Sequence, residues 1–253
     1  MSTFRQKDDC IGGTPPWYAP RMAEQFFITG AARGLGLAMT RQLLEQGHLV
    51  SVLVRQDSGG LSDLQARSGE RLSIHVGDVT DEASIQRAFA EVAARVGHLD
   101  VIINDAVIYL DGSRPSIEDA DLDICARTFE VNAVGPLRVV KHGLPLLRKG
   151  SRKLIVNVSS EAGSIGDCRR KTEYAYCMSK SALNMGTQLL QNHLAPEGIR
   201  VLALHPGWFN SSGKGPAPIS AEEASVKVLA TILAPRTLEQ PMYVGPDGAA
   251  LPW

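Results

Sequence analysis

Tyr176 and Lys180 lie four positions apart in the stretch YAYCMSK, at residues 174–180. Four residues make about one turn of an α-helix, so the two side chains are expected to share one face. A phenol has a pKa of about 10 and is a poor acid–base catalyst at neutral pH, but a nearby cation favours its phenolate form. The spacing therefore indicates a proton donor beside an activating ammonium group, although such pairs are also common on plain surface helices. Tyr174 has Met178 four residues on, which is not a base.

A second candidate site is the run TGAARGLG at residues 29–36. Its glycines, Gly30, Gly34 and Gly36, let the backbone turn tightly and approach a ligand closely. A helix that follows directs its free N–H groups and positive dipole into this gap, where a pyrophosphate fits. A strand, a glycine turn and a helix in this order predict a dinucleotide site. The alternative is a simple strand-to-helix connection.

Six short apolar runs, bounded by Gly, Asp or Ser, alternate with stretches of helical spacing. They are QFFIT (25–29), LVSVLV (49–54), RLSIHVGDV (71–79), LDVIIN (99–104), KLIVNVSS (153–160) and RVLALHPG (200–207). The runs are typical of strands buried on both faces. The alternation predicts an α/β fold, a doubly wound parallel sheet with helices on both faces. In such sheets ligands bind beyond the carboxyl ends of the strands, where both candidate sites fall.

The chain divides into an arm and one domain. Residues 1–24 contain GGTPPWYAP, which is unfavourable for a helix or a central strand, so a flexible or extended arm is expected there. Residues 25–253 are expected to form a single catalytic domain. The composition of the 253 residues, 44% hydrophobic and 21% charged, suits one large α/β domain with a buried core.

Charge and hydropathy exclude several classes of protein. The net charge of −1 gives no indication of a nucleic-acid or membrane-surface partner. No apolar run approaches the roughly 18–20 residues of a membrane span, and the amino terminus has no apolar core of a signal peptide. The four cysteines show no CxxC spacing and are expected to be free thiols, so a cytoplasmic location is predicted.

The order of motifs along residues 25–253 resembles that of the short-chain dehydrogenase/reductase family. The matches are TGAARGLG, GDVT at 77–80, a variant of NNAG at 104–107, EVNAVG around Asn132, NVSS at 157–160, YCMSK at 176–180 and HPGW at 205–208. The ALHPGW stretch and the closing DGAALPW are similar to the branch of the C-factor and sniffer carbonyl reductases. The resemblance implies a Rossmann-type fold and an oxidoreductase that transfers hydride between a nicotinamide cofactor and a small carbonyl compound or alcohol.

The resemblance also implies the roles of the catalytic residues. Tyr176 gives a proton to the carbonyl oxygen as hydride arrives, or removes one in the reverse direction. Ser160 holds the substrate oxygen, with Ser164 as a weaker alternative. Lys180 also holds the nicotinamide ribose, and Asn132 anchors a water chain to this lysine.

The preferred cofactor follows from the end of the second apolar run, at Val54 and Arg55. NAD-binding proteins usually place an aspartate there to bind the ribose hydroxyls, but this chain has no acid at either position. Arg33 lies inside the glycine turn, so Arg33 and Arg55 could clasp a 2′-phosphate. The sequence therefore favours NADP(H) over NAD(H), with two solvated arginines as the alternative. The family's remaining cofactor positions fall on Leu35, Asp78, Val79, Asn104, Pro206, Gly207 and Ser211, besides the glycines, Tyr176 and Lys180.

Three features depart from the family pattern or extend it. Asp105 and Val107 replace an amide and a glycine of NNAG, and a β-branched residue tolerates positive φ poorly. The loop between Ser160 and Tyr176 is enlarged and carries consecutive cations, at residues 169–171, which are either a solvated loop or a device that selects acidic substrates. The helix after Tyr176 carries more apolar surface than one core-facing stripe needs, which predicts a homodimer or homotetramer, as is usual in the family.

Three functions remain open from the sequence. The first is an NADPH-dependent carbonyl reductase or the matching alcohol dehydrogenase. The second is a biosynthetic tailoring enzyme that reduces an imine or couples reduction to another step. The third is a signalling or regulatory protein that binds NADP without turnover. Fold alone cannot separate them.

Overall fold

The computed structural model describes residues 23–253, except 58, 211–216, 236, 238–239 and 241. Within this part, seven strands form one parallel sheet in the order β3-β2-β1-β4-β5-β6-β9. The strands are β1 (Gln25–Thr29), β2 (Leu49–Val54), β3 (Leu72–Val76), β4 (Val101–Asn104), β5 (Leu154–Val158), β6 (Arg200–Leu204) and β9 (Tyr243–Val244). The first six coincide with the predicted runs. The seventh has only two residues, too few for a hydrophobic period to indicate it.

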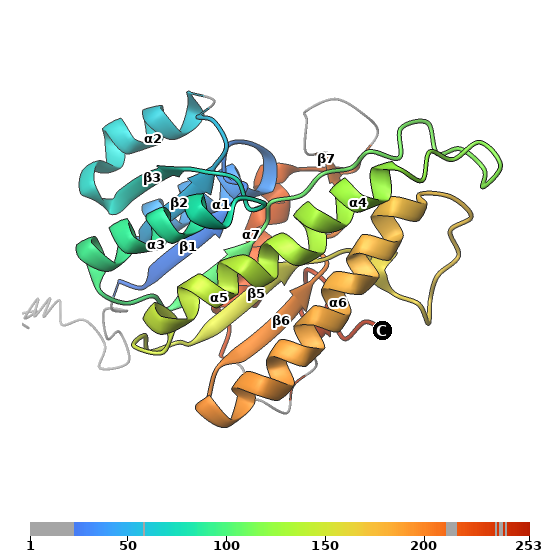
Figure 1. Cartoon of the computed structure of the whole chain (residues 1–253). Helices are drawn as coiled ribbons and strands as arrows, with labels where there is room; N and C mark the ends of the chain where they lie inside the picture. The colour runs from blue at the N-terminus through green and yellow to red at the C-terminus, as the bar shows by residue number, and fades with distance from the viewer. Residues whose placement is uncertain (1–22, 58, 211–216, 236, 238–239, 241) are drawn as a thin grey trace, which may run out of the picture.

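Helices cover both faces of this sheet, as the sequence predicted (Figure 1). They are α1 (Gly34–Glu45), α2 (Gly60–Ser68), α3 (Glu82–Val96), α4 (Ile124–Phe129), α5 (Gly135–Leu147), α6 (Tyr174–Leu194) and α7 (Ala221–Leu233). Helices α1 and α7 lie side by side on one face, and α3, α5 and α6 lie on the other. A two-residue pair, β7 (Phe209–Asn210) and β8 (Ile219–Ser220), lies outside the main sheet.

Strand β1 shows why the strands appear in the sequence as continuous apolar runs. Phe26 and Ile28 are buried in the core beneath α1 and α7, whereas Phe27 is buried on the opposite face. Successive side chains of a strand point to opposite faces, so a strand covered on both sides needs apolar residues at every position. Phe27 stacks on Phe89 of α3, with ring centroids 4.3 Å apart. Because all the strands of this sheet are parallel, their carboxyl ends lie along one edge.

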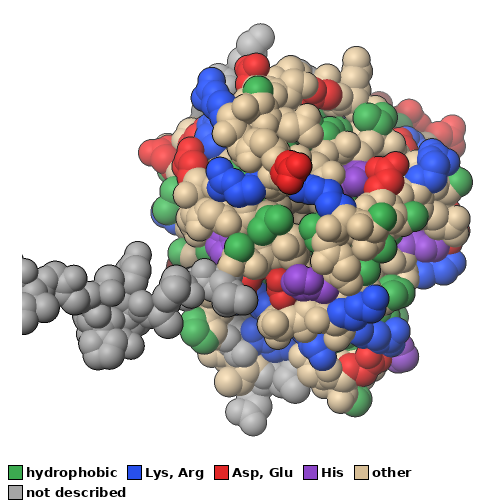
Figure 2. Space-filling model, turned by 90° about the vertical axis from the view of Figure 1, so that its left-hand side faces the viewer, with side chains coloured by type: hydrophobic (Ala, Val, Ile, Leu, Met, Phe, Trp, Pro, Cys, Tyr) green, Lys and Arg blue, Asp and Glu red, His purple; other side chains and the backbone are tan. Residues whose placement is uncertain are grey.

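The predicted arm, residues 1–24, lies outside the described residues except for Ala23 and Glu24. No helix in the described part of the chain is long and apolar enough to cross a lipid bilayer. Figure 2 shows one face of the molecule, on which acidic, basic and hydrophobic side chains are interspersed. This mixture agrees with the net charge of −1.

Candidate active site

The glycine turn connects β1 to α1 and packs against the residues that follow β4. Gly30 has a φ of +78°, and a Cβ atom added to it would lie 2.7 Å from the Cα of Ala106. A Cβ on Gly36 would lie 2.8 Å from a carboxylate oxygen of Asp105. Both contacts are too close for any side chain, so glycine is required at these two positions. Thr29 completes the junction, because its hydroxyl accepts hydrogen bonds from the N–H groups of Asp105 and Ala106.

A cavity of about 570 Å³ opens beside this turn, within the usual size range of ligand sites. Helix α1 begins here, and its N-cap residue, Arg33, makes no side-chain capping bond. Uncapped N–H groups at the positive end of a helix fit a pyrophosphate. The predicted cofactor residues that line the cavity are Gly30, Arg33, Gly34, Leu35, Arg55, Asp78 and Val79. Other predicted cofactor residues lie outside its lining: Gly36, Asn104, Tyr176, Lys180, Pro206 and Gly207.

Asp78 is held at the rim of this cavity by a residue that the sequence did not indicate. Its carboxylate accepts hydrogen bonds from the N–H and hydroxyl of Thr80 and lies 3.5 Å from the guanidinium of Arg127. Burial opposes ionisation, but the Thr80 hydrogen bonds and the charges of Arg127 and Arg55 outweigh it and lower the pKa of Asp78. Arg127 lies in α4, so only the folding of that helix beside the third strand brings it here.

Asn104 lies at the end of β4 and faces the neighbouring strand rather than the cavity. Its amide donates to the Oδ1 of Asn157 in β5 at 2.8 Å, and Asn157 in turn donates to Thr187 of α6 at 2.8 Å. This chain of hydrogen bonds joins two strands to the helix that carries Tyr176. The geometry therefore supports a positioning role for Asn104.

Asp105, an acid at the position of the amide in the NNAG motif, lies within the protein and lines the cavity beside the glycine turn. Its carboxylate accepts a hydrogen bond from the N–H of Gly36. Burial raises the pKa of Asp105 to about 7, although the charge of Lys180 and the Gly36 bond oppose this shift. Val107 also lines the cavity, and it is not among the described non-glycine residues with positive φ. The concern about its backbone conformation was therefore wrong.

The first turn of α6 is fixed by a residue far away in the sequence. The carboxylate of Asp111 accepts hydrogen bonds from the N–H groups of Ala175 and Tyr176, at 3.1 and 3.0 Å. The N-cap residue itself, Glu173, makes no capping bond and has a left-handed backbone with φ +68°. Such a conformation costs roughly 1–2 kcal/mol for a non-glycine residue. It persists here because the buried Glu173 carboxylate bonds Tyr109 and Arg170 and lies 3.2 Å from the Arg114 guanidinium.

Tyr176 is surrounded by protein yet retains some exposure, as an acid–base residue at a cleft requires. Its hydroxyl is hydrogen-bonded to the side chain of Ser160, and its ring packs edge-to-face on Tyr109 with centroids 5.4 Å apart. Burial raises the pKa of Tyr176 to about 12, against the lowering effect of the Ser160 bond. The lowering that the sequence predicted is thus not found in the protein alone, because burial disfavours the phenolate more strongly.

Lys180 lies one turn along α6, and its Nζ is 5.8 Å from the centroid of the Tyr176 ring. The ammonium group is buried and donates to the main-chain oxygen of Val158, at the end of β5, at 2.8 Å. Burial lowers the pKa of Lys180 to about 8, and the charge of Asp105 opposes this shift. The predicted sharing of one helix face by Tyr176 and Lys180 is confirmed by this geometry.

Asn132 lies in a π-helical turn, Glu130–Val134, between α4 and α5. Its amide group accepts from the N–H of Ile108 and donates to the Ile108 oxygen, both at 2.9 Å. It also lies 3.1 Å from the hydroxyl of Ser179, the residue before Lys180. A π-turn inside a helix often marks a functional position. Here it places one asparagine against both the loop after β4 and the catalytic helix.

Ser160 leaves the end of β5 and is fixed through its main chain by a residue near the end of the chain. The buried hydroxyl of Tyr243 donates to the Ser160 oxygen at 2.5 Å, and the Tyr243 ring stacks on Trp253. Ser164, the alternative to Ser160, instead accepts from the N–H of Asp167 and donates to the Trp253 oxygen. The structure therefore brings Ser160, rather than Ser164, to Tyr176.

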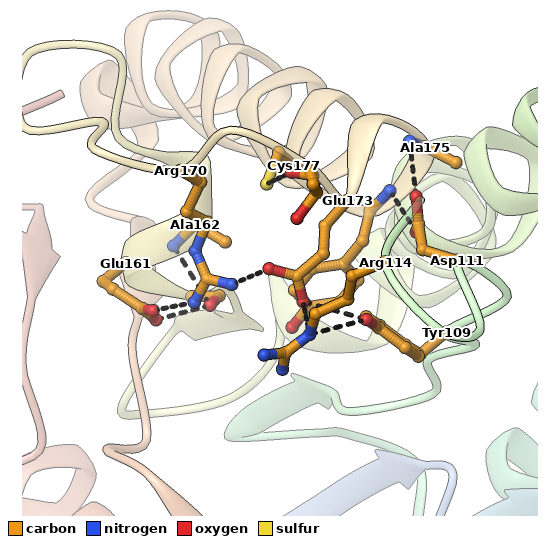
Figure 3. A network of polar contacts seen from close by, with 12 residues as sticks. Tyr109, Asp111, Arg114, Glu161, Ala162, Arg170, Glu173, Ala175 and Cys177 are labelled. Atoms are coloured by element: carbon orange, nitrogen blue, oxygen red, sulfur yellow. Dashed lines mark hydrogen bonds and ion pairs between the residues drawn. The ribbon is translucent and has the colours of Figure 1, made fainter. Parts of the chain in front are cut away.

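Ion pairs of Arg170 with Glu161 and Glu173 stabilise the enlarged loop between Ser160 and Tyr176 (Figure 3). Arg170 bridges the carboxylates of Glu161 and Glu173, whereas the Arg169 side chain is 90% exposed. The guanidinium of Arg170 is thus already paired with two carboxylates of the chain. This pairing argues against the expectation that Arg170 is available to bind an acidic substrate.

The turn after β6 carries the last predicted residues. Pro206 is buried, and Gly207 has a φ of +83°, which favours glycine. Trp208 follows with an exposed side chain. Ser211 lies outside the described residues, so its predicted contact with the cofactor stays a prediction.

Comparison with known proteins identifies the family. The family model described as short chain dehydrogenase matches residues 24–218. The chain belongs to this family. Proteins of the short-chain dehydrogenase family are oxidoreductases that bind a nicotinamide cofactor.

Several characterised proteins are similar to this short-chain dehydrogenase. The C-signal of Myxococcus xanthus is 36% identical over 168 residues, which is 66% of this chain and 99% of that protein. The carbonyl reductase Sniffer of D. melanogaster superposes with a TM-score of 0.85 at 28% identity, over 92% of this chain and all of that one. The NADPH-bound carbonyl reductase from chicken fatty liver gives 0.82 at 28% identity, over 91% and 99%. These relatives agree with the branch that the ALHPGW and DGAALPW motifs resemble.

The raised pKa of Asp105 makes a testable prediction about pH. The pKa of Asp105 is about 7 in the folded protein and about 3.9 for an unfolded chain. Ionisation of Asp105 therefore lowers the free energy of unfolding progressively as the pH rises from about 4 to about 7. Asp105→Asn keeps the shape of the side chain and has no such cost. The variant should therefore exceed the parent in Tm by a margin that is smallest near pH 4, grows to pH 7 and is constant above it.

Thermal unfolding followed by circular dichroism at pH 4, 5.5, 7 and 8.5 measures this margin. Val226→Ala, at an exposed position of α7, changes no ionisable group and is the control, with a margin that should not vary with pH. A margin for Asp105→Asn that does not vary with pH would contradict the assigned ionisation.

Proposed function

We propose that this short-chain dehydrogenase is an NADP(H)-dependent carbonyl reductase, or the matching alcohol dehydrogenase, with residues 25–253 as its catalytic domain. The observation that carries the proposal is that the side chains of Ser160 and Tyr176 lie close enough to interact, with the buried Lys180 one helical turn beyond Tyr176. The three groups lie at the carboxyl edge of the sheet, as does the cofactor cavity. The carbonyl reductases among the similar structures support the same substrate class.

Tyr176 is the proton donor in this proposal. With a pKa of about 12, its hydroxyl keeps its proton at neutral pH and can give it to a carbonyl oxygen that becomes an alkoxide. The bound cofactor supplies the hydride. Ser160 lies beside the Tyr176 hydroxyl, and when its proton turns from Glu161 to the substrate, a carbonyl oxygen that contacts both receives two hydrogen bonds where its negative charge develops.

Lys180 stabilises the phenolate that proton donation leaves behind. Its ammonium group lies 5.8 Å from the centroid of the ring, and an opposite charge within about 6 Å favours the ionised form of a phenol. Its position is set by the Val158 carbonyl and, through Ser179, by Asn132. A proton reaches Tyr176 again by way of the lysine, in agreement with the role that the family resemblance assigns to Asn132.

The preference for NADP(H) rests on the charges at the end of β2. Arg33 and Arg55 both line the cavity, and both side chains are exposed to it and to solvent. Val54 occupies the position where an acid would accept hydrogen bonds from the ribose of NAD. Two guanidinium groups without an opposing acid at that position favour a 2′-phosphate. The chicken relative, whose structure is described as NADPH-bound, agrees with this choice.

A non-catalytic signalling role is the second candidate, because one relative is named C-signal. The buried carboxyl of Asp105 beside the glycine turn would also weaken the binding of an anionic cofactor when it is ionised. The paired Tyr176 and Ser160 favour catalysis over this alternative. The tailoring reduction of an imine would use the same residues and is distinguished only by its substrate.

We also propose that the protein forms a homodimer through α5 and α6. Met185 and Leu189 lie one turn apart on α6 and are each 61% exposed, and Leu137 of α5 is exposed beside Gly186. The adjacent Leu183 is buried in the core, so Met185 and Leu189 are additional to the inward face of the helix. Contiguous exposed apolar side chains on neighbouring helices are typical of an interface.

Tyr176→Phe removes the proton donor but keeps the ring that packs on Tyr109. Turnover of NADPH with carbonyl substrates should fall by at least about a hundredfold, while the Kd for NADPH stays within a few-fold. The matched control is Tyr174→Phe, whose hydroxyl bonds only the exposed Lys171 oxygen and should matter little. A Tyr176→Phe enzyme with a tenth of the parent rate would exclude Tyr176 as the donor.

Replacement of Arg33 and Arg55 together by alanine should weaken NADPH by about 3 kcal/mol, or about a hundredfold in Kd, if both contacts are made. The affinity for NADH should scarcely change, because NADH has no 2′-phosphate. Fluorescence titration with both cofactors measures the two effects. Arg67→Ala with Arg95→Ala, outside the cavity, is the matched double control. Equal losses for the two cofactors would show that Arg33 and Arg55 serve the fold instead.

Met185→Glu with Leu189→Glu places two charges on the proposed interface and should convert the dimer to a monomer. Light scattering at micromolar concentration gives the mass directly. The control is Val226→Glu, which changes a 58% exposed side chain on α7, across the sheet, and should leave the mass unchanged. A parent protein that sediments as a clean 27.2 kDa species would refute the proposed assembly.

A further inference from the structure

The hydrogen bonds of Ser160 leave its proton directed away from Tyr176. The Ser160 hydroxyl accepts from the N–H of Ala162 at 3.1 Å and donates to the Oε2 of Glu161 at 2.8 Å. Because a hydroxyl has one proton to give, Ser160 cannot donate to Glu161 and to Tyr176 or a substrate oxygen at the same time. A carboxylate thus lies within one hydrogen bond of the serine that would hold the substrate oxygen.

Glu161 remains accessible although it is bound on two sides. Its Oε1 accepts from Arg170 and its Oε2 from Ser160, yet the side chain is 49% exposed (Figure 3). Burial opposes ionisation, but the hydrogen bonds from Arg170 and Ser160 outweigh it and lower the pKa of Glu161. Each carboxylate oxygen accepts about two hydrogen bonds. Oε2 therefore has acceptor capacity left for a ligand.

His205 places a second polar atom beside the carboxylate of Glu161. Its Nδ1 is buried, makes no hydrogen bond with any described residue and lies 3.6 Å from the Oε2 of Glu161. Burial lowers the pKa of His205, so its ring is neutral at neutral pH and has one donor and one acceptor nitrogen. A buried polar atom without a partner is costly, and it is a position where a ligand atom is expected to bind.

The charges around Glu161 and His205 favour the binding of a neutral polar group over that of an ion. The negative charge of Glu161 is offset by the bound guanidinium of Arg170. A ligand hydroxyl can donate to Glu161 and interact with His205 through its oxygen, which suits both atoms at once. An ammonium group would satisfy Glu161 but would lie close to Arg170.

We propose that Glu161 and His205 form a hydroxyl-binding subsite beside Ser160, and that the substrates are ketones or aldehydes with a hydroxyl on the carbon next to the carbonyl. This inference rests on the proposed reductase function. Hydride from NADPH adds to the carbonyl carbon, the carbonyl oxygen takes the proton of Tyr176, and the neighbouring hydroxyl is kept. The products are a vicinal diol and NADP⁺, and a proton from solvent restores Tyr176.

The spacing of the protein atoms matches this class of compound. The two oxygens of an α-hydroxy ketone are about 2.8 Å apart, about the length of a hydrogen bond between hydroxyl groups. The Ser160 Oγ and Glu161 Oε2 are separated by the same 2.8 Å. One substrate oxygen can therefore accept from Tyr176 and Ser160, while the substrate hydroxyl replaces Ser160 as the donor to Oε2 of Glu161 and lies beside His205.

The test compares three matched ketones, namely 2-hydroxy-1-phenylethanone, acetophenone and 2-amino-1-phenylethanone. With NADPH, the parent should show a kcat/KM for the hydroxy ketone at least about tenfold above that for acetophenone, because a site built to bind a hydroxyl rejects the analogue without it. Glu161→Gln and His205→Phe should each reduce this ratio to within about threefold of one. Asp167→Asn makes the same acid-to-amide change in the same loop, where Asp167 lies 3.6 Å from the exposed Arg169, and should keep the parent ratio.

Three kinetic results would overturn the subsite. They are a parent ratio near one, a ratio that both variants leave unchanged, and a preference for the amino ketone, which would indicate a cation site. Calorimetric titration of each ketone into the enzyme–NADP⁺ complex separates the subsite from the reaction. Preferential binding of the hydroxy ketone without turnover supports the subsite and contradicts the reductase function. Equal binding, or no detectable binding of any of the three without turnover, contradicts the subsite.

Discussion

The parallel direction of the strands is the constraint on which the rest of the structure depends. Because every strand of the main sheet ends on the same edge, the turns that follow β1, β4, β5 and β6 meet there. Gly30 packs tightly against Ala106, because a Cβ atom added to Gly30 would lie 2.7 Å from the Cα of Ala106. The glycine turn therefore serves two purposes. It leaves room for a ligand's phosphates, and it lets the segment after β4 approach the first strand.

A second set of contacts lies at the start of α6, on the same edge of the sheet. The carboxylate of Asp111 binds the first N–H groups of α6, and the ion pair of Glu173 with Arg170 stabilises the left-handed backbone of Glu173 itself, the residue before the helix. These contacts fix where α6 begins, and the helix period then fixes Tyr176 relative to Lys180. The loop before α6 therefore helps to position Tyr176, because its ion pairs stabilise the backbone from which Tyr176 projects.

Burial around Tyr176 shifts the pKa values of acids and bases in opposite directions. It raises the pKa of Tyr176 and of Asp105, and it lowers that of Lys180. A neutral phenol and an ammonium with a pKa of about 8 suit donation of a proton near neutral pH. The acid at position 105 works against an anionic cofactor at higher pH. The replacement of the NNAG residues by Asp105 and Val107 thus changes the electrostatics of the site more than its backbone conformation.

The sequence by itself determined the six longer strands, the glycine turn and the pairing of Tyr176 with Lys180. These features depend on local periods and on the backbone freedom of glycine, which act over a few residues. Only the tertiary structure decided the contacts of Asp111 with Tyr176 and of Tyr243 with Ser160, which join residues 65 and 83 positions apart. It also decided that Arg170 binds Glu161 and Glu173, and that burial raises rather than lowers the pKa of Tyr176. Such contacts and pKa shifts arise from packing between distant segments, which no local pattern of residue types records.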